Sequence, residues 1–219
     1  NAMPACTTGQ YNVVIGSNSM TIANNDESKN TIVGYQAMYN MDGDVTDTEN
    51  TALGYKAGYY VGTGIHNTFL GHATGFGVGD SGGGAGSGHL TGDGNTAVGY
   101  AAGNAMQGAG HSNTYLGAAA GNVGTTAVEN TCIGYNCDIE DATATNQVVI
   151  GNNLTGTKDN AVFIGNDSSH IENDFNADAT WNHSSDVRQK TDIKDESLGL
   201  SFVEDLRPVT YKHKSPSEF

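Results

Sequence analysis

Closely spaced carboxylates are the first residues of this sequence whose type and spacing could do chemistry. Asp42, Asp44 and Asp47 lie within one short stretch, and a second acidic group occupies residues 138–141. Carboxylate oxygens at short spacing are the ligands that Ca²⁺ prefers. Neither group has the ordered spacing of an EF-hand loop, so a solvated loop is the stronger interpretation of both. Asp42, Asp44 and Asp47 remain weak candidates for a metal site.

Histidine and cysteine add little to this chemistry. None of the seven histidines has the HxH or HExxH spacing of a metal site, although His66, His111 and His183 stand near predicted strand entries. On the axis of a symmetric trimer, one such histidine would become three. Cys132 and Cys137 lack the second pair that a zinc site requires, and three cysteines make no disulfide framework. We therefore expect no cofactor.

A glycine-rich stretch at 75–94, GFGVGDSGGGAGSGHLTGDG, contains GxG patterns. A phosphate-binding loop needs a strand before it and a helix after it, and neither is indicated here. The stretch is better explained as one long surface insertion. Such a loop could contact a receptor, and an unstructured tip is the simpler alternative.

Composition excludes several classes of protein. Glycine contributes 31 of 219 residues and charged residues only 15%, which disfavours a helical bundle because glycine costs helix stability. The net charge is −15, so the chain would repel nucleic acid and anionic membrane surfaces. No apolar run approaches the roughly 20 residues of a membrane span. We expect neither nucleic-acid binding nor membrane insertion.

A sequence repeat, exemplified by NTAVGYAAGN at 95–104, recurs along the chain. It suggests which structural elements position the candidate site residues. A short unit with variable insertions is typical of a solenoid, in which each unit forms one rung. The copies align on a glycine and are 14 to 28 residues apart: Gly16, Gly34, Gly54, Gly71, Gly99, Gly117, Gly134, Gly151 and Gly165.

Two columns of the aligned phrase predict a short β-strand. A large aliphatic residue precedes each glycine, and a β-branched residue stands two positions earlier, as in Thr51 and Leu53. β-branched residues with a period of two are typical of a strand that shows both columns on one face. We expect this face to pack inside the roll.

The column between those two is also mostly apolar, and we expect it to face outward against a partner chain. Nine outward apolar residues would otherwise leave a large exposed patch, and a symmetric homo-oligomer is the simplest cover. The predicted interface column is Val14, Ile32, Ala52, Phe69, Ala97, Tyr115, Cys132, Val149 and Phe163.

The residues around each strand fit tight corners. Asparagine can close a turn through its side chain and stack in an amide ladder. Glycine after the strand permits a positive φ, and a second glycine, such as Gly58 or Gly103, predicts a second corner. The expected ladder contains Asn30, Asn50, Asn67, Asn95, Asn113 and Asn130.

These phrases, and above all NQVVIGNN at 146–153 and NAVFIGND at 160–167, resemble the head repeats of trimeric autotransporter adhesins. Similar phrases occur in phage tail-fibre proteins. The resemblance implies an all-β fold, a left-handed parallel β-roll, and three rolls packed side by side. In the middle copies the Asn-to-Gly distance is one residue shorter than in the last two.

Residues 184–214, SSDVRQKTDIKDESLGLSFVEDLRPVTYKHK, differ in kind. Leu198, Phe202 and Leu206 would share one face of a short helix ending before Pro208. The segment resembles the start of the endosialidase-type intramolecular chaperone domain, which assists trimer assembly in phage tail spikes and then cuts itself off. The resemblance implies that Ser185 is the nucleophile and Lys190 its base in the full-length protein.

We therefore expect three parts: residues 1–2 as an expression remnant, 3–180 as the roll, and 181–219 as the first part of the chaperone domain. The expected function is structural and receptor-binding, in a phage tail fibre or tail spike made in the host cytoplasm and carried on the virion. The expected partners are two further copies and a host surface receptor such as a glycan.

Three alternatives stay open. The first is the head of a bacterial trimeric surface adhesin, located at the cell surface. The second is a polysaccharide depolymerase, which would need a carboxylate pair held in a groove, and no repeat strand carries one. The third is an ice-binding solenoid, suggested by the threonine column. We disfavour it because we expect threonine on the core side, and because the repeat spacing is irregular.

Overall fold

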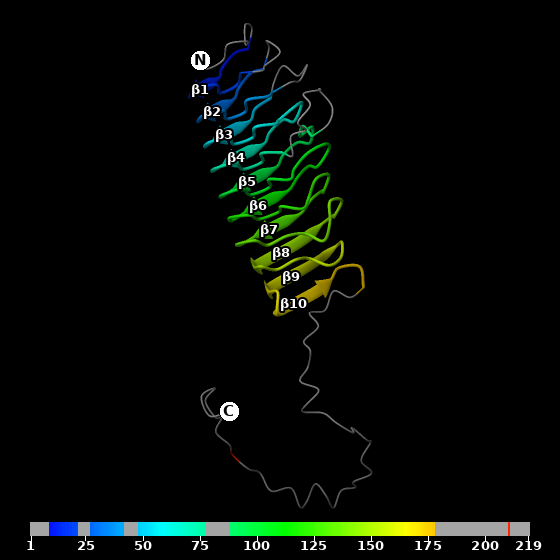
Figure 1. The fold of residues 1–219 in the computed structure, drawn as a ribbon. Helices are drawn as coiled ribbons and strands as arrows, with labels where there is room; N and C mark the ends of the chain where they lie inside the picture. Colours follow the sequence, from blue (N-terminus) through cyan, green and yellow to red (C-terminus); the bar gives the residue numbers. More distant parts are fainter. Residues whose placement is uncertain (1–8, 22–26, 42–47, 78–87, 178–209, 211–219) are drawn as a thin grey trace, which may run out of the picture. The chain divides into compact units, whose positions relative to one another are not determined.

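The computed structural model describes residues 9–21, 27–41, 48–77, 88–177 and 210. These residues build ten strands in one sheet, in chain order, and no helix occurs among them (Figure 1). The chain divides into a unit of residues 1–182 and a unit of residues 183–219, and Thr210 alone is described in the second. The strands are β1 (Val13–Ile15), β2 (Thr31–Val33), β3 (Thr51–Leu53), β4 (Thr68–Leu70), β5 (Thr96–Val98), β6 (Thr114–Leu116), β7 (Thr131–Ile133), β8 (Gln147–Asn152), β9 (Ala161–Asn166) and β10 (Ser169–Asp174).

The first nine strands form a parallel β-solenoid, which confirms the all-β parallel roll that the sequence predicts. Each strand pairs with the next in exact repeat register, so that Thr51 of β3 lies between Thr31 of β2 and Thr68 of β4. The stack makes about eight turns, and the variable insertions leave the register intact because they lie in the connections between strands. The handedness expected from the resemblance stays a prediction.

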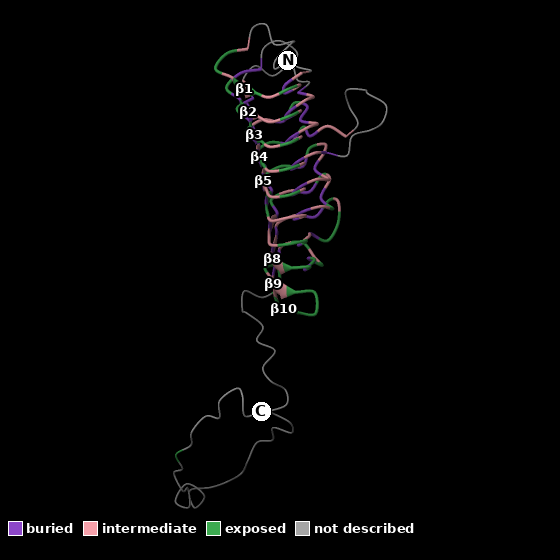
Figure 2. Cartoon of the chain, turned by 60° about the vertical axis from the view of Figure 1, so that its left-hand side comes forward, coloured by how far each residue is buried: buried purple, intermediate pink, exposed green. Residues whose placement is uncertain are grey.

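The structure inverts the two faces that the sequence predicts for each strand. The middle column is buried within this one chain, while the threonine and aliphatic columns are exposed or partly exposed. Figure 2 colours the residues by this burial. The prediction that the middle column forms a trimer interface is therefore wrong. Eight of its members are fully buried: Ile32, Ala52, Phe69, Ala97, Tyr115, Cys132, Val149 and Phe163.

The asparagine ladder explains why the faces are this way round. Side chains two residues apart in a strand share a face, so the asparagine before each strand must face the same way as the middle residue. Asn50 and Ala52 are both fully buried. A ladder of amide groups satisfies its hydrogen bonds inside the roll, and the middle column follows it there.

The predicted ladder is present and extends further than predicted. The backbone amide of Asn113 donates to Oδ1 of Asn95 at 3.0 Å, and the amide of Asn95 donates to Oδ1 of Asn67 at 2.8 Å. Nδ2 of Asn95 also donates to the carbonyl of Gly110 at 2.9 Å. Asn12 starts the ladder, since its Oδ1 accepts from the amide of Asn30. The buried polar column is therefore hydrogen-bonded along its length.

Glycine ends each repeat strand for a steric reason. Gly54 has a φ of 143°, and a Cβ atom placed on it would lie 2.1 Å from the carbonyl oxygen of Gly71. The same approach to the next rung recurs along the column. Gly151 alone among the nine has no left-handed φ, yet its Cβ would still meet the Gly165 oxygen at 2.0 Å.

The last two repeats have the same number of residues from the ladder position to the glycine as the middle copies, but their asparagine stands one position earlier. Gln147 occupies the ladder position and donates its backbone amide to Oδ1 of Asn130. Asn146 and Asn160 stand one position earlier, at φ values of 52° and 54°, where the preceding rung has Glu129 at 60°. The longer Asn-to-Gly distance therefore reflects asparagine in a left-handed corner, which this residue tolerates well.

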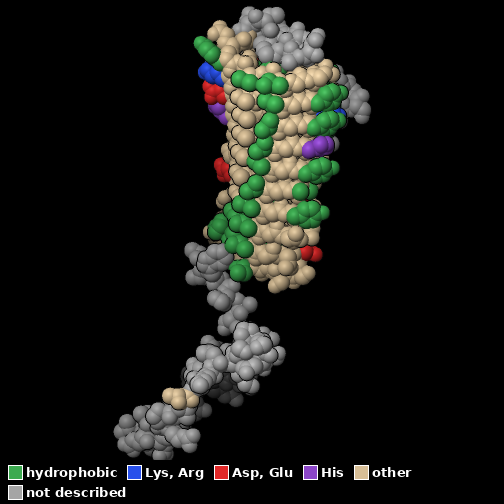
Figure 3. All heavy atoms as spheres, turned by 90° about the vertical axis from the view of Figure 1, so that its left-hand side faces the viewer, with side chains coloured by type: hydrophobic (Ala, Val, Ile, Leu, Met, Phe, Trp, Pro, Cys, Tyr) green, Lys and Arg blue, Asp and Glu red, His purple; other side chains and the backbone are tan. Residues whose placement is uncertain are grey.

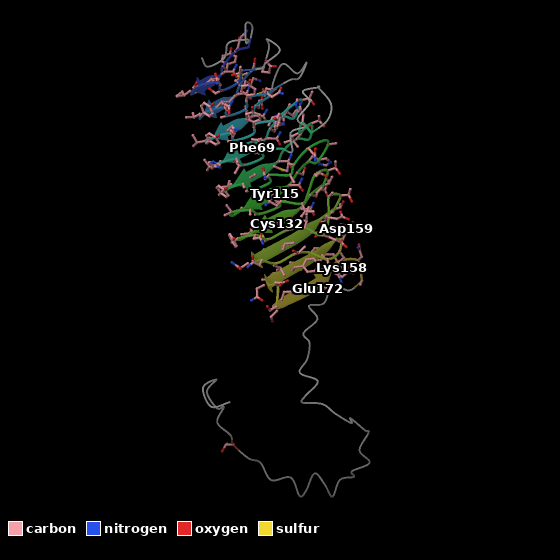
Figure 4. All side chains as sticks on the ribbon, in the orientation of Figure 1. Phe69, Tyr115, Cys132, Lys158, Asp159 and Glu172 are labelled. Atoms are coloured by element: carbon pink, nitrogen blue, oxygen red, sulfur yellow. The ribbon has the colours of Figure 1, made fainter. Side chains whose placement is uncertain are left out.

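An antiparallel strand, which the sequence analysis did not anticipate, ends the stack. β10 turns back on β9 through Asn166, whose Oδ1 accepts from the amides of Ser168 and Ser169. Lys158 forms ion pairs with Glu172 and Asp174 of β10 (Figure 4). The strand covers the edge of β9, which would otherwise expose a row of unpaired backbone groups.

Candidate functional site

Several predicted site residues lie outside the described part of the chain. These are Ser185 and Lys190, assigned to self-cleavage by resemblance, and the weak metal candidates Asp42, Asp44 and Asp47. The expected helix at 197–206 and the core of the 75–94 insertion lie outside it too. The end of that insertion returns to the roll, because Leu90 is buried and forms backbone bridges to Val61 and Gly108.

The second acidic group does not form a metal site. Asp138 is partly buried and Oδ1 accepts from the amides of Val123 and Ile139 at 3.2 and 2.9 Å. Burial raises the pKa of its carboxyl, and these hydrogen bonds oppose the shift. Glu140 and Asp141 are exposed. Across the described residues, no group of three histidine, cysteine or acidic side chains is placed to hold a metal ion.

His66 and His111 line one shallow groove of about 440 Å³ together with Asp93. Nε2 of His66 lies 3.1 Å from Oε2 of Glu49, and the ring of His111 contacts Ser112. The groove thus brings together two of the histidines that the sequence singled out. His183, the third, lies outside the described residues.

The two described cysteines meet inside the roll. Cys132 of β7 and Cys137 in the following turn are both free and fully buried. A hydrogen bond between the two thiols raises the pKa of Cys132 and lowers that of Cys137. Cys137 also donates to the carbonyl of Gly134 at 3.4 Å. The pair packs as small buried side chains inside the roll.

An aliphatic stripe runs the length of the outer strand face, as Figure 3 shows. We define it as the residue before each repeat glycine. Ile15, Leu53, Leu70 and Leu116 are 60%, 46%, 41% and 45% exposed, and the remaining members are partly exposed. Threonines flank the stripe on the strand. Large aliphatic side chains in an unbroken row are unusual on a monomeric surface.

A second stripe, made of aromatic rings, stands beyond the glycines (Figure 3). Tyr35, Tyr55, His72 and Tyr100 each follow a repeat glycine and stack from rung to rung, with ring centroids 5.5, 4.8 and 5.2 Å apart. We call these four rings the aromatic ladder. Its three tyrosines are 45%, 43% and 63% exposed. This column was not predicted, although the position after each repeat glycine holds its signal in the sequence.

More rings continue the ladder around the next corner. Tyr59 stacks on Tyr39 at 5.0 Å, and Phe76 lies 5.2 Å from Tyr59. Tyr60 meets Tyr59 edge-on at 4.6 Å. Burial, followed by the neighbouring tyrosines, raises the pKa of Tyr59. We call Tyr39, Tyr59, Tyr60 and Phe76 the corner cluster.

Lys56 joins the ladder to the corner cluster. Its Nζ lies 5.5 Å from the ring centre of Tyr55, 5.3 Å from that of Tyr59 and 5.6 Å from that of Phe76. Within the described residues, the other two lysines, Lys29 and Lys158, bind carboxylates, and Lys56 forms no ion pair. A cation over several ring faces is held electrostatically while its N–H groups remain donors.

Comparison with known proteins gives no relative: no family model, no curated protein and no solved structure matches the chain. No helix that could span a membrane is found in the part of the chain that the structure describes.

Proposed function

We propose that this chain is a structural and receptor-binding segment of a phage tail fibre or tail spike, in which three copies of the roll pack through the aliphatic stripe. The fold supports the proposal because a β-solenoid is long and displays its insertions outward. The number three rests on the resemblance of the repeat to adhesin heads, and the setting on the resemblance of residues 184–214 to the intramolecular chaperone domain. Release of that domain by Ser185 and Lys190 belongs to the proposal for the full-length protein.

The observation that carries the proposal is the outward aliphatic stripe. Inside the roll, side-chain size varies from Ala52 to Tyr115, whereas the stripe contains only valine, leucine and isoleucine. Burial of apolar surface drives most protein association. Because every rung offers the same kind of side chain, a second copy in register would meet a matching surface along its whole length.

The mass of the chain in solution tests this proposal directly. At micromolar concentration, we expect light scattering to give three times the chain mass of 22.7 kDa. The double variant Leu53→Glu/Leu70→Glu places charges in the stripe and should give monomers. Thr126→Glu/Thr157→Glu adds the same charge at exposed positions away from the strands and should leave the trimer intact. A wild-type monomer would refute the proposal.

Self-cleavage has its own test in the full-length protein. A lysine with a lowered pKa can act as the base that takes the proton of a serine hydroxyl, whose oxygen then attacks the carbonyl carbon of a peptide bond. The C–N bond breaks, the amine leaves with that proton, and water hydrolyses the ester that remains. We expect the intact mass of the wild type to show two fragments, and that of Ser185→Ala to show one uncut chain. If both proteins are cut, or both stay full-length, the assignment of the Ser185 and Lys190 pair fails.

The adhesin and depolymerase alternatives fare differently. A surface adhesin would use the same stripe and the same trimer, so only the cleavage test separates it from a tail fibre. A depolymerase needs two carboxylates beside a substrate groove. Strands β1–β9 carry none, and the acidic pair of β10, Glu172 and Asp174, binds Lys158. The structure therefore offers this alternative no new support.

The outward threonines favour one second candidate, an ice-binding surface. Thr31, Thr51 and Thr114 are exposed, and parallel pairing keeps all six threonines of the column in register. Two expectations spoke against this function: that the threonines face the core, and that the irregular repeat spacing disturbs their alignment. Both are wrong for the strand face, where the threonines point outward and pair in regular register. Since three packed rolls would cover this face, the two functions exclude each other. A monomer that depresses the freezing point below the melting point would support ice binding.

A further inference from the structure

The stacked aromatic rings gather in one region of the roll, while the exposed rings of Tyr11, Tyr135 and Phe175 lie outside it. The aromatic ladder and the corner cluster occupy four neighbouring rungs, and the described aromatic residues elsewhere are mostly isolated or buried. Stacked rings could stabilise a solenoid equally well if their side chains were buried. Tyr100 is nevertheless 63% exposed, so the ladder keeps ring surface available to a ligand. Stacking covers both faces of Tyr55 and of His72, whereas no described ring stacks on the far face of Tyr100. Such an open face attracts the weakly positive C–H groups on one side of a saccharide ring.

Charge selects among saccharides. On the face that Figure 3 shows, acidic side chains lie along the edge opposite the aromatic stripe and below the lower end of the stripe. Lys56 is the one cation among these rings, and its ammonium group has no carboxylate within ion-pair distance in the described part of the chain. An amine that is partly desolvated by rings forms a strong hydrogen bond with an anionic oxygen. The chain is otherwise strongly acidic, so the site offers a local exception.

We propose that the aromatic ladder and the corner cluster, joined by Lys56, bind an acidic oligosaccharide: one sugar ring packs on the open face of Tyr100 at the end of the ladder, and a carboxylate of the oligosaccharide accepts from Lys56 Nζ. This inference rests on the proposed function and names the class of receptor, an acidic glycan of a host surface. The corner cluster follows Gly58 and Gly75 in the turn beyond the strands, so it lies off the aliphatic stripe through which copies would pack.

The test measures binding of hexuronic acid and sialic acid oligosaccharides by titration calorimetry, each beside its neutral carboxyl-reduced form. We expect the wild type to bind at least one acidic oligosaccharide and to bind its reduced form about tenfold more weakly, as the loss of one charge-assisted hydrogen bond predicts. Raising the salt concentration should weaken the binding of the acidic form only.

Two lysine variants give the matched comparison. Lys56→Gln should lose about the same tenfold in affinity for the acidic oligosaccharide and nothing for the neutral one. Lys29→Gln removes an equal charge at a site paired with Glu49, and its affinity should equal that of the wild type. Tyr100→Ala should weaken the binding of both forms because it removes the open ring face.

Each outcome decides the proposal. If no acidic oligosaccharide in the panel binds, or if Lys56→Gln and Lys29→Gln behave alike, the site is refuted. Light scattering on the same samples keeps this result separate from the trimer. If the protein is a trimer but binds no saccharide, only the glycan site is refuted. If it is a monomer and binds the acidic oligosaccharide through Lys56, only the trimer is refuted.

Discussion

The inner and outer faces of the same strands obey different rules. The inner column contains residues as different as Ala97, Tyr115 and Cys132, while the outer stripe never departs from three aliphatic types. Inside the roll, the residues that face the middle column vary in size with the side chain that they contact. The ring of Phe69 fills the space that side chains at Gly58 and Gly75 would take, since Cβ atoms there would lie 2.7 and 2.2 Å from it (Figure 4).

This contrast teaches that uniformity along a repeat need not mark the core. A core side chain has partners within its own chain, so its size can vary if the facing residue varies too. A surface that meets copies of itself has no such freedom, because every rung faces an equivalent rung. In this roll the varied column is internal and the uniform one external.

The largest effect is expected where the two faces meet, at the glycine that ends each strand. Gly54→Ala would place a Cβ atom 2.1 Å from the Gly71 oxygen at a φ of 143°. We expect a loss of at least about 4 kcal/mol in the free energy of unfolding, measured by denaturant titration. Gly94→Asn is the control: it has a φ of 66° with no atom within 4 Å of its Cβ, and asparagine accepts this conformation.

Adjacent residues of β4 compare the faces directly. Phe69→Ala opens a cavity in the core and should cost about 3–5 kcal/mol. Leu70→Ala, 41% exposed in the chain, should cost under about 1 kcal/mol within one roll. If the stripe joins copies, Leu70→Ala should also lower the dependence of the unfolding midpoint on protein concentration. Equal costs for both variants would contradict the assignment of faces.

The ladder on the inner face should be less costly to break than the core. Asn95→Ala leaves the amide of Asn113 without its acceptor and the carbonyl of Gly110 without its donor. Two buried polar groups left unpaired should cost about 3 kcal/mol in the free energy of unfolding. Asn104→Ala, outside the ladder, should change stability by under about 0.5 kcal/mol. Similar losses in both variants would mean that the ladder contributes no stability.

The sequence predicted the repeat, the parallel stacking and the ladder because these depend on local rules that every copy repeats. It assigned the faces wrongly since both columns of a strand are apolar, and hydrophobicity alone cannot choose between them. Asn50 and Ala52 indicate which face is internal, because side chains two residues apart in a strand share a face. The ladder asparagine, not the apolar residues, therefore identifies the buried column.

The candidate ligand site was less predictable. Stacking of Tyr55 on Tyr35 and His72 follows from the repeat, since each ring stands directly after a repeat glycine. The corner cluster does not, because Tyr59, Tyr60 and Phe76 approach only once the second turn has folded. The cap formed by β10 gave no repeat signal because it occurs once.

The smallest effect concerns Asp138, which lies on neither strand face. Since burial raises the pKa of its carboxyl, the folded chain binds this proton more tightly than the unfolded chain. Its contribution to stability is therefore largest in acid and is lost as pH rises from about 3.9 through the raised pKa. Asp138→Asn keeps an oxygen for the amides of Val123 and Ile139, so it should match the wild type near pH 3.

Near pH 7, where the carboxylate is charged, the same variant should be the more stable one by under about 1 kcal/mol. Thermal unfolding of both proteins at a series of pH values gives the difference and removes the titration that they share. If the wild type is instead the more stable protein at neutral pH, the two backbone hydrogen bonds to the carboxylate outweigh its burial. The turn around Asp138 would then stabilise the charged carboxylate over the neutral carboxyl group. The conclusion that burial raises the pKa of Asp138 would be refuted.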